Sequence, residues 1–234
     1  PNVLVFARRV IDYASNPKCA IPAKLLTSIR ERQGGSMAKL YFRYGAMNSG
    51  KSTALLQVAH NYEERSQQVL IAKPAVDTKG DSTIVSRLGV DRRVDFLVTP
   101  GDNLRTLTHE HSNEDLIIPG IKNLACLLID EAQFLSREQV DQAFELAILD
   151  DIPVLCYGIR TDFLTNGFPG SLRLMEMAHS LEELKTICRC GRKAMFNGRK
   201  VDGDFIFEGE QVAIDGVEVT YESLCGVCYL NERG

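Results

Sequence analysis

The most constraining feature of the sequence is a glycine-framed loop near residue 50. Residues 45–52 read GAMNSGKS and match the pattern G-x-x-x-x-G-K-[ST] at every position. A run of strand formers, Leu40–Tyr44, precedes the loop, and a run with helical spacing follows it from Ser52 to about Arg65. In this context backbone N–H groups and the positive end of a helix surround phosphate groups. The sequence therefore predicts a nucleotide phosphate site.

Each residue type in the loop has a chemical task. Gly45 and Gly50 allow the backbone to curl around the phosphates. Lys51 is expected to reach the β- and γ-phosphates, and Ser52 is suited to hold Mg²⁺. The remaining loop positions, which contribute backbone N–H groups, are Ala46, Met47, Asn48 and Ser49.

A second motif is an apolar run that ends in two acids, Leu127–Glu131 (LLIDE). An aspartate in this position of a phosphate-loop fold helps to hold Mg²⁺, which assigns that role to Asp130. Glu131 beside it is a candidate general base. If the attacking group is water, the protein is an ATPase, and if it is a substrate hydroxyl, the protein is a kinase. The alternative is that Glu131 only caps the strand or pairs with Lys51.

The pattern of apolar runs predicts an α/β fold. Residues 69–72, 124–129 and 152–157 are expected to form strands, the last two of them buried on both faces. Residues 136–149 have helical spacing and begin with a capping box, and 77–93 are expected to form a loop. Strands that alternate with helices indicate a parallel sheet with helices on its faces.

The cysteines divide into isolated and paired ones. Cys126 and Cys156 lie in apolar runs, and Cys19 lies near the N-terminus. The other four form two close pairs separated by about 35 residues, Cys188 with Cys190 and Cys225 with Cys228. Two disulfides or four unrelated thiols are possible, but the spacing favours a four-thiolate structural zinc site. Between the pairs, short alternating runs at 204–207 and 217–221 indicate a small β domain.

Charge separates the chain into two parts. Residues 1–36 carry six basic and two acidic side chains, whereas 37–234 carry 21 basic and 29 acidic ones, so a net charge of +4 precedes one of −8. The first part is interpreted as an artefact of upstream translation or expression, a disordered basic arm or an organelle transit peptide, and we favour the first two. The acidic second part argues against nucleic-acid binding. No run of about 18 apolar residues is present, which argues against a membrane-spanning helix.

Together these motifs resemble the type II thymidine kinases, the zinc-containing cytosolic family, in wording close to its bacterial members. The resemblance covers essentially all of 37–230. The segments that carry it, in addition to the closing cysteine pair, are Gly45–Thr53 (GAMNSGKST), Asp130–Phe134 (DEAQF), Gly158–Phe163 (GIRTDF) and Leu184–Ala194 (LKTICRCGRKA).

The resemblance implies roles for individual residues. Glu131 matches the catalytic base that takes the proton of the thymidine 5′-hydroxyl, and Gln133 is implied in nucleotide binding. A lasso loop from about Glu210 to Tyr221 is implied to grip the thymine. Within it, Tyr221 and Gly216 are the residues that match the family's loop and are implied to bind the base. The implied thymine pocket consists of Met47, Phe134, Ile159, Phe163 and Phe168, with Phe163 stacking on the base. The implied zinc ligands are Cys188, Cys190, Cys225 and Cys228.

The expected architecture is a phosphate-loop parallel sheet with flanking helices over 37–187 and a small zinc-binding β domain with a lasso over 188–234. The expected reaction is ATP-dependent phosphorylation of thymidine, with Mg²⁺ and structural Zn²⁺. The resemblance also implies a cytoplasmic homotetramer inhibited by dTTP. Two alternative functions remain, a zinc-ribbon ATPase that acts on DNA and a non-catalytic nucleotide-sensing module.

Between 117 and 123 the chain has extra residues relative to the family.

Overall fold

The computed structural model describes residues 37–75, 82–85, 89, 91–112, 124–209, 211 and 219–234. From Ala38 to Gly234 the chain forms one compact unit. The expected leader (1–36), the extra residues at 117–123 and the core of the expected lasso (212–218) lie outside the described residues.

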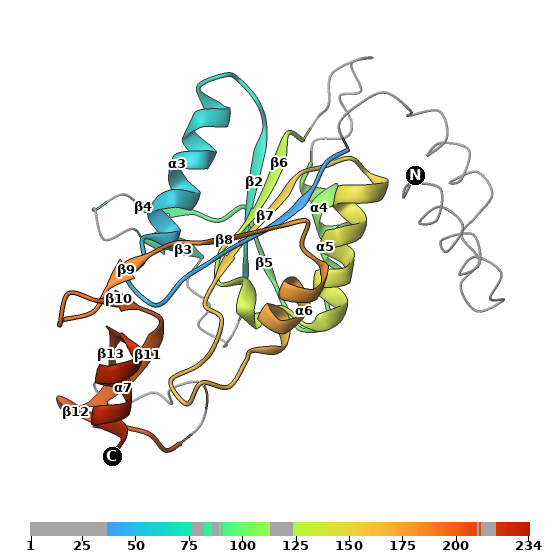
Figure 1. The fold of residues 1–234 in the computed structure, drawn as a ribbon. Coiled ribbons are helices and arrows are strands. Elements are labelled where there is room, and N and C mark those ends of the chain that lie inside the picture. Colours follow the sequence, from blue (N-terminus) through green and yellow to red (C-terminus); the bar gives the residue numbers. More distant parts are fainter. Residues whose placement is uncertain are drawn as a thin grey trace, which may run out of the picture. The chain divides into compact units, whose positions relative to one another are not determined.

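A six-stranded parallel sheet forms the centre of this unit (Figure 1). Its strand order is β5-β2-β6-β7-β1-β8, so β7 lies between β1 and β6. The two central strands β6 and β7 are buried along their whole length, which explains why their sequences read as unbroken apolar runs. The predicted α/β parallel sheet is confirmed. The strands are β1 Leu40–Tyr44, β2 Val69–Pro74, β5 Phe96–Val98, β6 Cys126–Ile129, β7 Val154–Gly158 and β8 Ser180–Glu183.

Helices cover both faces of the sheet. Helix α3 (Lys51–Glu63) packs its apolar residues on one face, and helices α4 (Leu104–His111), α5 (Arg137–Leu149) and α6 (Pro169–Met177) cover the other (Figure 1). Helix α5 begins with the predicted capping box, in which the Ser136 hydroxyl and the side chain of Gln139 satisfy each other's backbone N–H groups. Among the helices in the described ranges, none is long and apolar enough to span a bilayer.

The expectation of a loop over 77–93 is wrong in part. Its described residues include a short antiparallel pair, β3 (Thr83–Val85) and β4 (Asp91–Arg93). The pair is held to helix α3 by an ion pair between Arg92 and Glu63, and Ile84 packs into the core beneath α3. The sequence of this segment is polar because only one side chain of β3 is buried, and it therefore has no apolar pattern from which these strands could be predicted.

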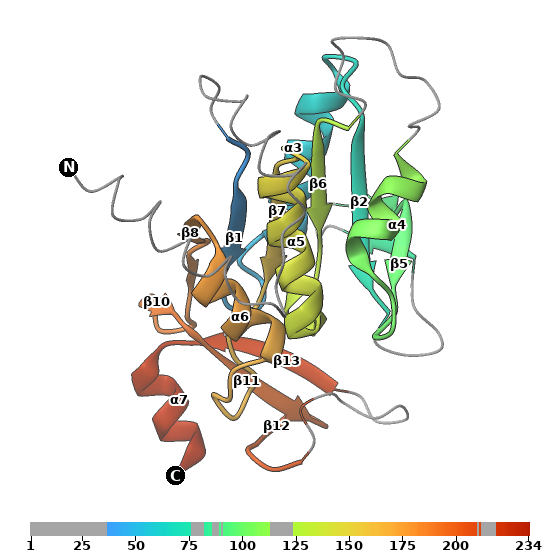
Figure 2. The same ribbon diagram turned by 90° about the vertical axis from the view of Figure 1, so that its right-hand side faces the viewer.

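The C-terminal region is built on a three-stranded antiparallel sheet of order β12-β11-β13 (Figure 2). One face of this sheet and helix α7 (Gly226–Arg233) enclose a small core that includes Cys188, Leu224 and Tyr229. The predicted β character is confirmed at 204–207, and α7 is an element that the sequence reading missed. The strands of the region are β9 Thr186–Ile187, β10 Lys193–Ala194, β11 Phe196–Val201, β12 Asp204–Ile206 and β13 Val219–Leu224.

Gly170, near the start of α6, fixes how closely that helix approaches the 3₁₀ turn η1 (Ala132–Phe134). A Cβ at this position would meet the carbonyl oxygens of Leu135, Ala132 and Gln133 at 2.6–2.8 Å. We therefore expect Gly170→Ala to lower the free energy of unfolding by about 1–3 kcal/mol, measured by urea denaturation, because backbone atoms must shift. Gly101→Ala is the control, since a Cβ there has no described atom within 4 Å. Equal stability of the two variants would contradict the close packing.

Candidate active site

The phosphate loop joins β1 to α3 in a backbone conformation that few sequences permit. A Cβ at Gly45 would lie 2.4 Å from the Leu184 carbonyl oxygen, and Asn48 and Gly50 have φ values of 67° and 77° in the left-handed region. Gly50 is also the N-cap of α3 and has no side chain to satisfy the first backbone N–H groups of the helix. The loop thus offers N–H donors and the positive end of a helix at one place, which suits an anion.

Lys51 is buried at the base of the loop. Its Nζ donates to the carbonyl oxygens of Ala46 at 3.0 Å and Gly45 at 3.4 Å. Burial lowers the pKa of this ammonium group, and the nearby carboxylates of Glu131 and Asp130 oppose the shift. The cation is therefore held inside the loop where phosphate oxygens would compete with the two carbonyls.

Asp130, which follows β6, meets the loop through Ser52. The Ser52 hydroxyl lies 3.3 Å from Asp130 Oδ2, although 78 residues separate the two. Asp130 is 4% exposed, and its Oδ1 has no hydrogen-bond partner among the described residues. Burial, and then the neighbouring charge of Glu131, raise its pKa to about 6. A buried, unpartnered carboxylate oxygen beside a hydroxyl fits a site for Mg²⁺, a cation that prefers oxygen ligands.

Glu131 occupies a strained backbone position at the next residue. Its φ of 50° lies in the left-handed region, which is uncommon for glutamate and often accompanies function. Gln133 donates from its side-chain amide to Glu131 Oε2, and its Oε1 accepts from the Ile159 N–H at 3.2 Å. Gln133 thus fixes the direction of the Glu131 carboxylate from a buried position between the ends of β6 and β7.

A cavity of about 950 Å³ brings the two predicted motifs together with the predicted base pocket. This volume is within the range of sites for small molecules. Gly45, Ala46, Ser49 and Asp130 do not line it, and Gly216 lies outside the described residues. The predicted residues that line the cavity are Met47, Asn48, Gly50, Lys51, Ser52, Glu131, Gln133, Phe134, Ile159, Phe163, Phe168 and Tyr221.

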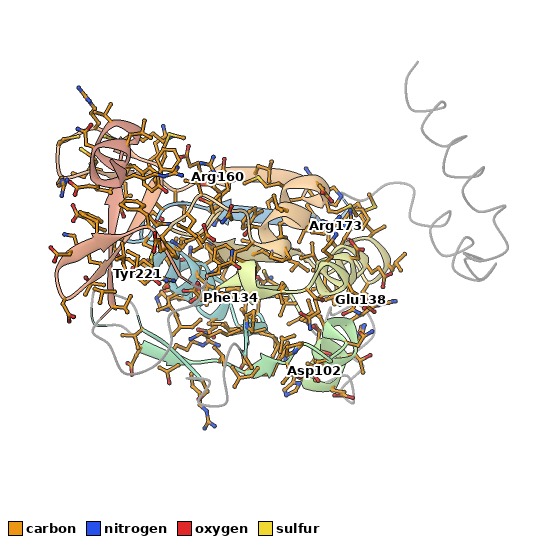
Figure 3. The ribbon with its side chains drawn as sticks, turned by 90° about the horizontal axis from the view of Figure 1, so that it is seen from below. Asp102, Phe134, Glu138, Arg160, Arg173 and Tyr221 are labelled. Carbon is orange, nitrogen blue, oxygen red and sulfur yellow. The ribbon has the colours of Figure 1, made fainter. Side chains whose placement is uncertain are left out.

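Aromatic rings form the apolar end of the cavity. Phe134 and Phe168 make an edge-to-face contact with ring centroids 5.4 Å apart, and Tyr221 reaches the cavity from β13 (Figure 3). Phe163 is only 1% exposed, and the guanidinium group of Arg199 lies over its ring, 3.7 Å from the centroid. Phe163 therefore has an aromatic face already covered by the protein.

Several residues of the site were not found from the sequence. Arg199, on β11, donates to the Tyr221 hydroxyl at 3.2 Å and to the Gln211 carbonyl oxygen at 2.9 Å. The Gln211 side chain in turn donates to Asp162, whose other oxygen accepts two backbone N–H groups of its own turn. These polar groups link the aromatic pocket to the C-terminal sheet. Arg199 belongs to none of the predicted motifs, and the contacts of Asp162 and Gln211 could not be predicted from their segments, since the groups meet only through the fold.

The four paired cysteines converge at one point of the C-terminal region. Their Sγ atoms all lie within 4.8 Å of one another, with Cys190 and Cys225 at 3.5 Å. Tetrahedral zinc with bonds of about 2.3 Å places its sulfur ligands about 3.8 Å apart, so this cluster fits zinc. The hydrogen bond from the Cys228 N–H, and then those from the neighbouring cysteine side chains, lower the pKa of the Cys225 thiol to about 6, which favours a thiolate there.

Comparison with known proteins agrees with this geometry. A family model described as "Thymidine kinase" matches residues 38–229. The thymidine kinase of Idiomarina loihiensis is 51% identical over 192 residues, which cover 81% of this chain and 94% of the relative. The thymidine kinase of Legionella pneumophila (strain Paris) is 49% identical over 195 residues, which cover 82% and 90%.

Among solved structures, the Pif1 helicase from Candida albicans matches with 13% identity and a TM-score of 0.34. The match covers 73% of this chain and 41% of the helicase chain. A TM-score this low supports no conclusion about the fold or the function. The fold and site define a phosphate-loop α/β protein with a thiolate cluster. With matches over most of its length, the chain belongs to the thymidine kinase family.

The buried charge of Asp130 opposes folding. Its folded pKa is raised to about 6 from an ordinary value of 3.8, so the folded protein binds the proton more tightly and stability falls as pH rises through this interval. We expect Asp130→Asn to raise the free energy of unfolding above pH 6 by about 1–3 kcal/mol, with little gain at pH 4. Calorimetry in Mg²⁺-free buffer measures the difference. A gain that is the same at both pH values would contradict this origin.

The cysteine cluster predicts one zinc ion per chain. We expect Cys190→Ser to bind zinc at least 10-fold more weakly than the unaltered protein, because a thiolate ligand is lost. Elemental analysis after dialysis against a chelator measures the content. Cys126→Ala is the control, since Cys126 is buried in β6 and does not belong to the cluster. Full zinc content in the Cys190→Ser protein would exclude Cys190 as a ligand.

Proposed function

We propose that this protein transfers the γ-phosphoryl group of ATP to the 5′-hydroxyl of thymidine, giving dTMP and ADP. The observation that carries the proposal is that the phosphate loop, Glu131 and an aromatic pocket open into one cavity. A cavity with a polar phosphate end and an apolar end suits a nucleoside whose hydroxyl must meet a phosphate. Membership of the thymidine kinase family supports thymidine as the nucleoside.

At the phosphate end, Lys51 and the loop N–H groups stabilise the charge that spreads over the transferred phosphoryl group. Lys51 and the N–H groups of the loop are in place before the reaction, because Gly45 and Gly50 fix the loop conformation. Asp130 and Ser52 are the residues that would hold Mg²⁺. When bound, Mg²⁺ supplies neutralising charge to the β- and γ-phosphate oxygens.

Glu131 is proposed to orient the 5′-hydroxyl and to accept its proton. Its carboxylate lines the cavity and receives a hydrogen bond from Gln133, which leaves one oxygen to face the substrate. Gln133, predicted to bind nucleotide, acts in this arrangement as the group that orients Glu131. The order of events is hydroxyl alignment, attack on phosphorus and transfer of the proton to the carboxylate.

The thymine base is proposed to bind at the aromatic end of the cavity. Phe134, Ile159 and Phe168 provide its apolar walls, and Tyr221 approaches from the C-terminal sheet. Phe163 is proposed to present one face to the pyrimidine while Arg199 supports the other face. Met47, inside the phosphate loop, connects this pocket to the phosphate end.

The remaining expectations concern the division of the chain into regions and its assembly. We propose that residues 37–187 bind ATP and that 188–234 hold zinc, which would anchor the lasso without chemistry of its own because four thiolates leave no open position. Residues 1–36 are proposed as a leader outside the catalytic unit. A cytoplasmic homotetramer with dTTP inhibition is the form expected from the family resemblance, and reducing conditions suit the six free cysteines of the described residues.

Replacement of Glu131 by Gln tests the proposed base. We expect kcat to fall by about 10²–10⁴-fold, because the amide cannot accept the proton. A coupled assay of ADP release with and without thymidine measures the rate. Glu138→Gln on helix α5 is the matched control, because Glu138 does not line the cavity and lies away from Phe134 and Tyr221 in Figure 3. ADP release that does not depend on thymidine would refute the proposed reaction and favour the ATPase alternative.

A further inference from the structure

Two side chains of the C-terminal sheet form hydrogen bonds with the backbone of the phosphate loop. The Met47 N–H donates to Asn197 Oδ1 at 2.7 Å, and the Met47 carbonyl oxygen accepts from the Ser223 hydroxyl. Asn197 on β11 and Ser223 on β13 are direct partners across the antiparallel pair. Both polar groups of one loop residue are thus held by two facing side chains of another sheet.

Asn197 and Ser223 are both buried, and their side chains are hydrogen-bonded. Asn197 is 3% exposed and Ser223 6% exposed, and the Asn197 amide also donates to the Thr161 carbonyl oxygen at 3.2 Å. Buried polar groups that are all hydrogen-bonded make an arrangement specific, since each lost partner leaves a desolvated group. The pair therefore holds the loop against the segment that leads to Phe163.

The phosphate loop needs such support. Asn48, the next residue, has a left-handed backbone with φ of 67°, a conformation that persists only where neighbouring contacts impose it. The Asn48 carbonyl oxygen accepts from the Thr186 hydroxyl at 3.4 Å, again from the C-terminal side. These contacts act on the residues whose N–H groups must point in the directions that phosphate oxygens require.

We propose that Asn197 and Ser223 are positioning residues for the phosphate loop, so that the C-terminal sheet determines nucleotide binding as well as nucleoside binding. The inference rests on the proposed function and concerns a different end of the same cavity. In this arrangement the Asn197 amide and the Ser223 hydroxyl both donate to backbone carbonyl oxygens. Their effect passes through the backbone of Met47, because its N–H, which the sequence predicts to face the phosphates, donates to Asn197 instead.

Ser223→Ala is the primary test, because it removes only the hydroxyl. We expect this variant to bind MgADP about 10-fold more weakly in isothermal titration calorimetry and to lose about 10-fold in kcat, the effect of one lost buried hydrogen bond. The KM for thymidine should stay within about twofold, because the aromatic pocket is not altered. Thr220→Ala, which removes an exposed hydroxyl from the same strand, is the matched control and should leave all three values unchanged.

A second pair of variants separates positioning from direct contact with the nucleoside, because Asn197 also lines the cavity. Asn197→Asp keeps an acceptor for the Met47 N–H, and Asn197→Leu removes it. The proposal predicts that MgADP affinity is retained better by Asn197→Asp than by Asn197→Leu. Equal loss of affinity in the two variants would overturn the proposal.

Two further outcomes also overturn the inference. One is a rise in the KM for thymidine with unchanged MgADP affinity in Ser223→Ala, which would make the pair a nucleoside contact. The other is unchanged MgADP affinity and unchanged kinetics in that variant. Failure of the proposed function is distinguishable from both, since it appears in the unaltered protein as ADP release without thymidine dependence, whereas MgADP binding is measured without turnover.

Discussion

The active site depends on one costly arrangement, a carboxylate buried at the end of a central strand. Asp130 is 4% exposed, one of its oxygens has no partner among the described residues, and Ser52 links it to the phosphate loop at 3.3 Å. An ionised group in such surroundings opposes folding unless a cation compensates it. The surrounding parallel sheet, with β6 and β7 buried throughout, supplies the stability that allows this group to remain.

Local chemistry explains why half of the site could be predicted from the sequence. The proposed roles of Lys51 and Asp130 follow from short patterns in which strand, loop and helix are adjacent, and the capping box of α5 is equally local. The α/β class follows from the unbroken apolar runs of β6 and β7. The spacing of the cysteines favoured the cluster that the structure shows, because two close pairs limit the possible geometry.

The rest depends on contacts that no local pattern encodes. Asn197 lies 150 residues from Met47, and Ser223 lies 176 residues from it, so their joint action on one loop residue requires the register of β11 against β13. Arg199 shares that face and supports Phe163. The hairpin of β3 and β4 was missed for a related reason, since its strands bury few side chains and are defined by packing beneath α3.

The alternation of side chains along β11 has a consequence for how the chain can change length. Asn197 and Arg199 face the cavity, whereas Gly198 faces the rings and aliphatic groups of Phe205 and Leu224 beside the cysteine cluster. Insertion of one residue into the strand before Asn197 would exchange the two faces and put the Asn197 amide in the place of Gly198, against Phe205 and Leu224. A single-residue insertion in the strand at this point would therefore disturb the cavity and the small C-terminal core together.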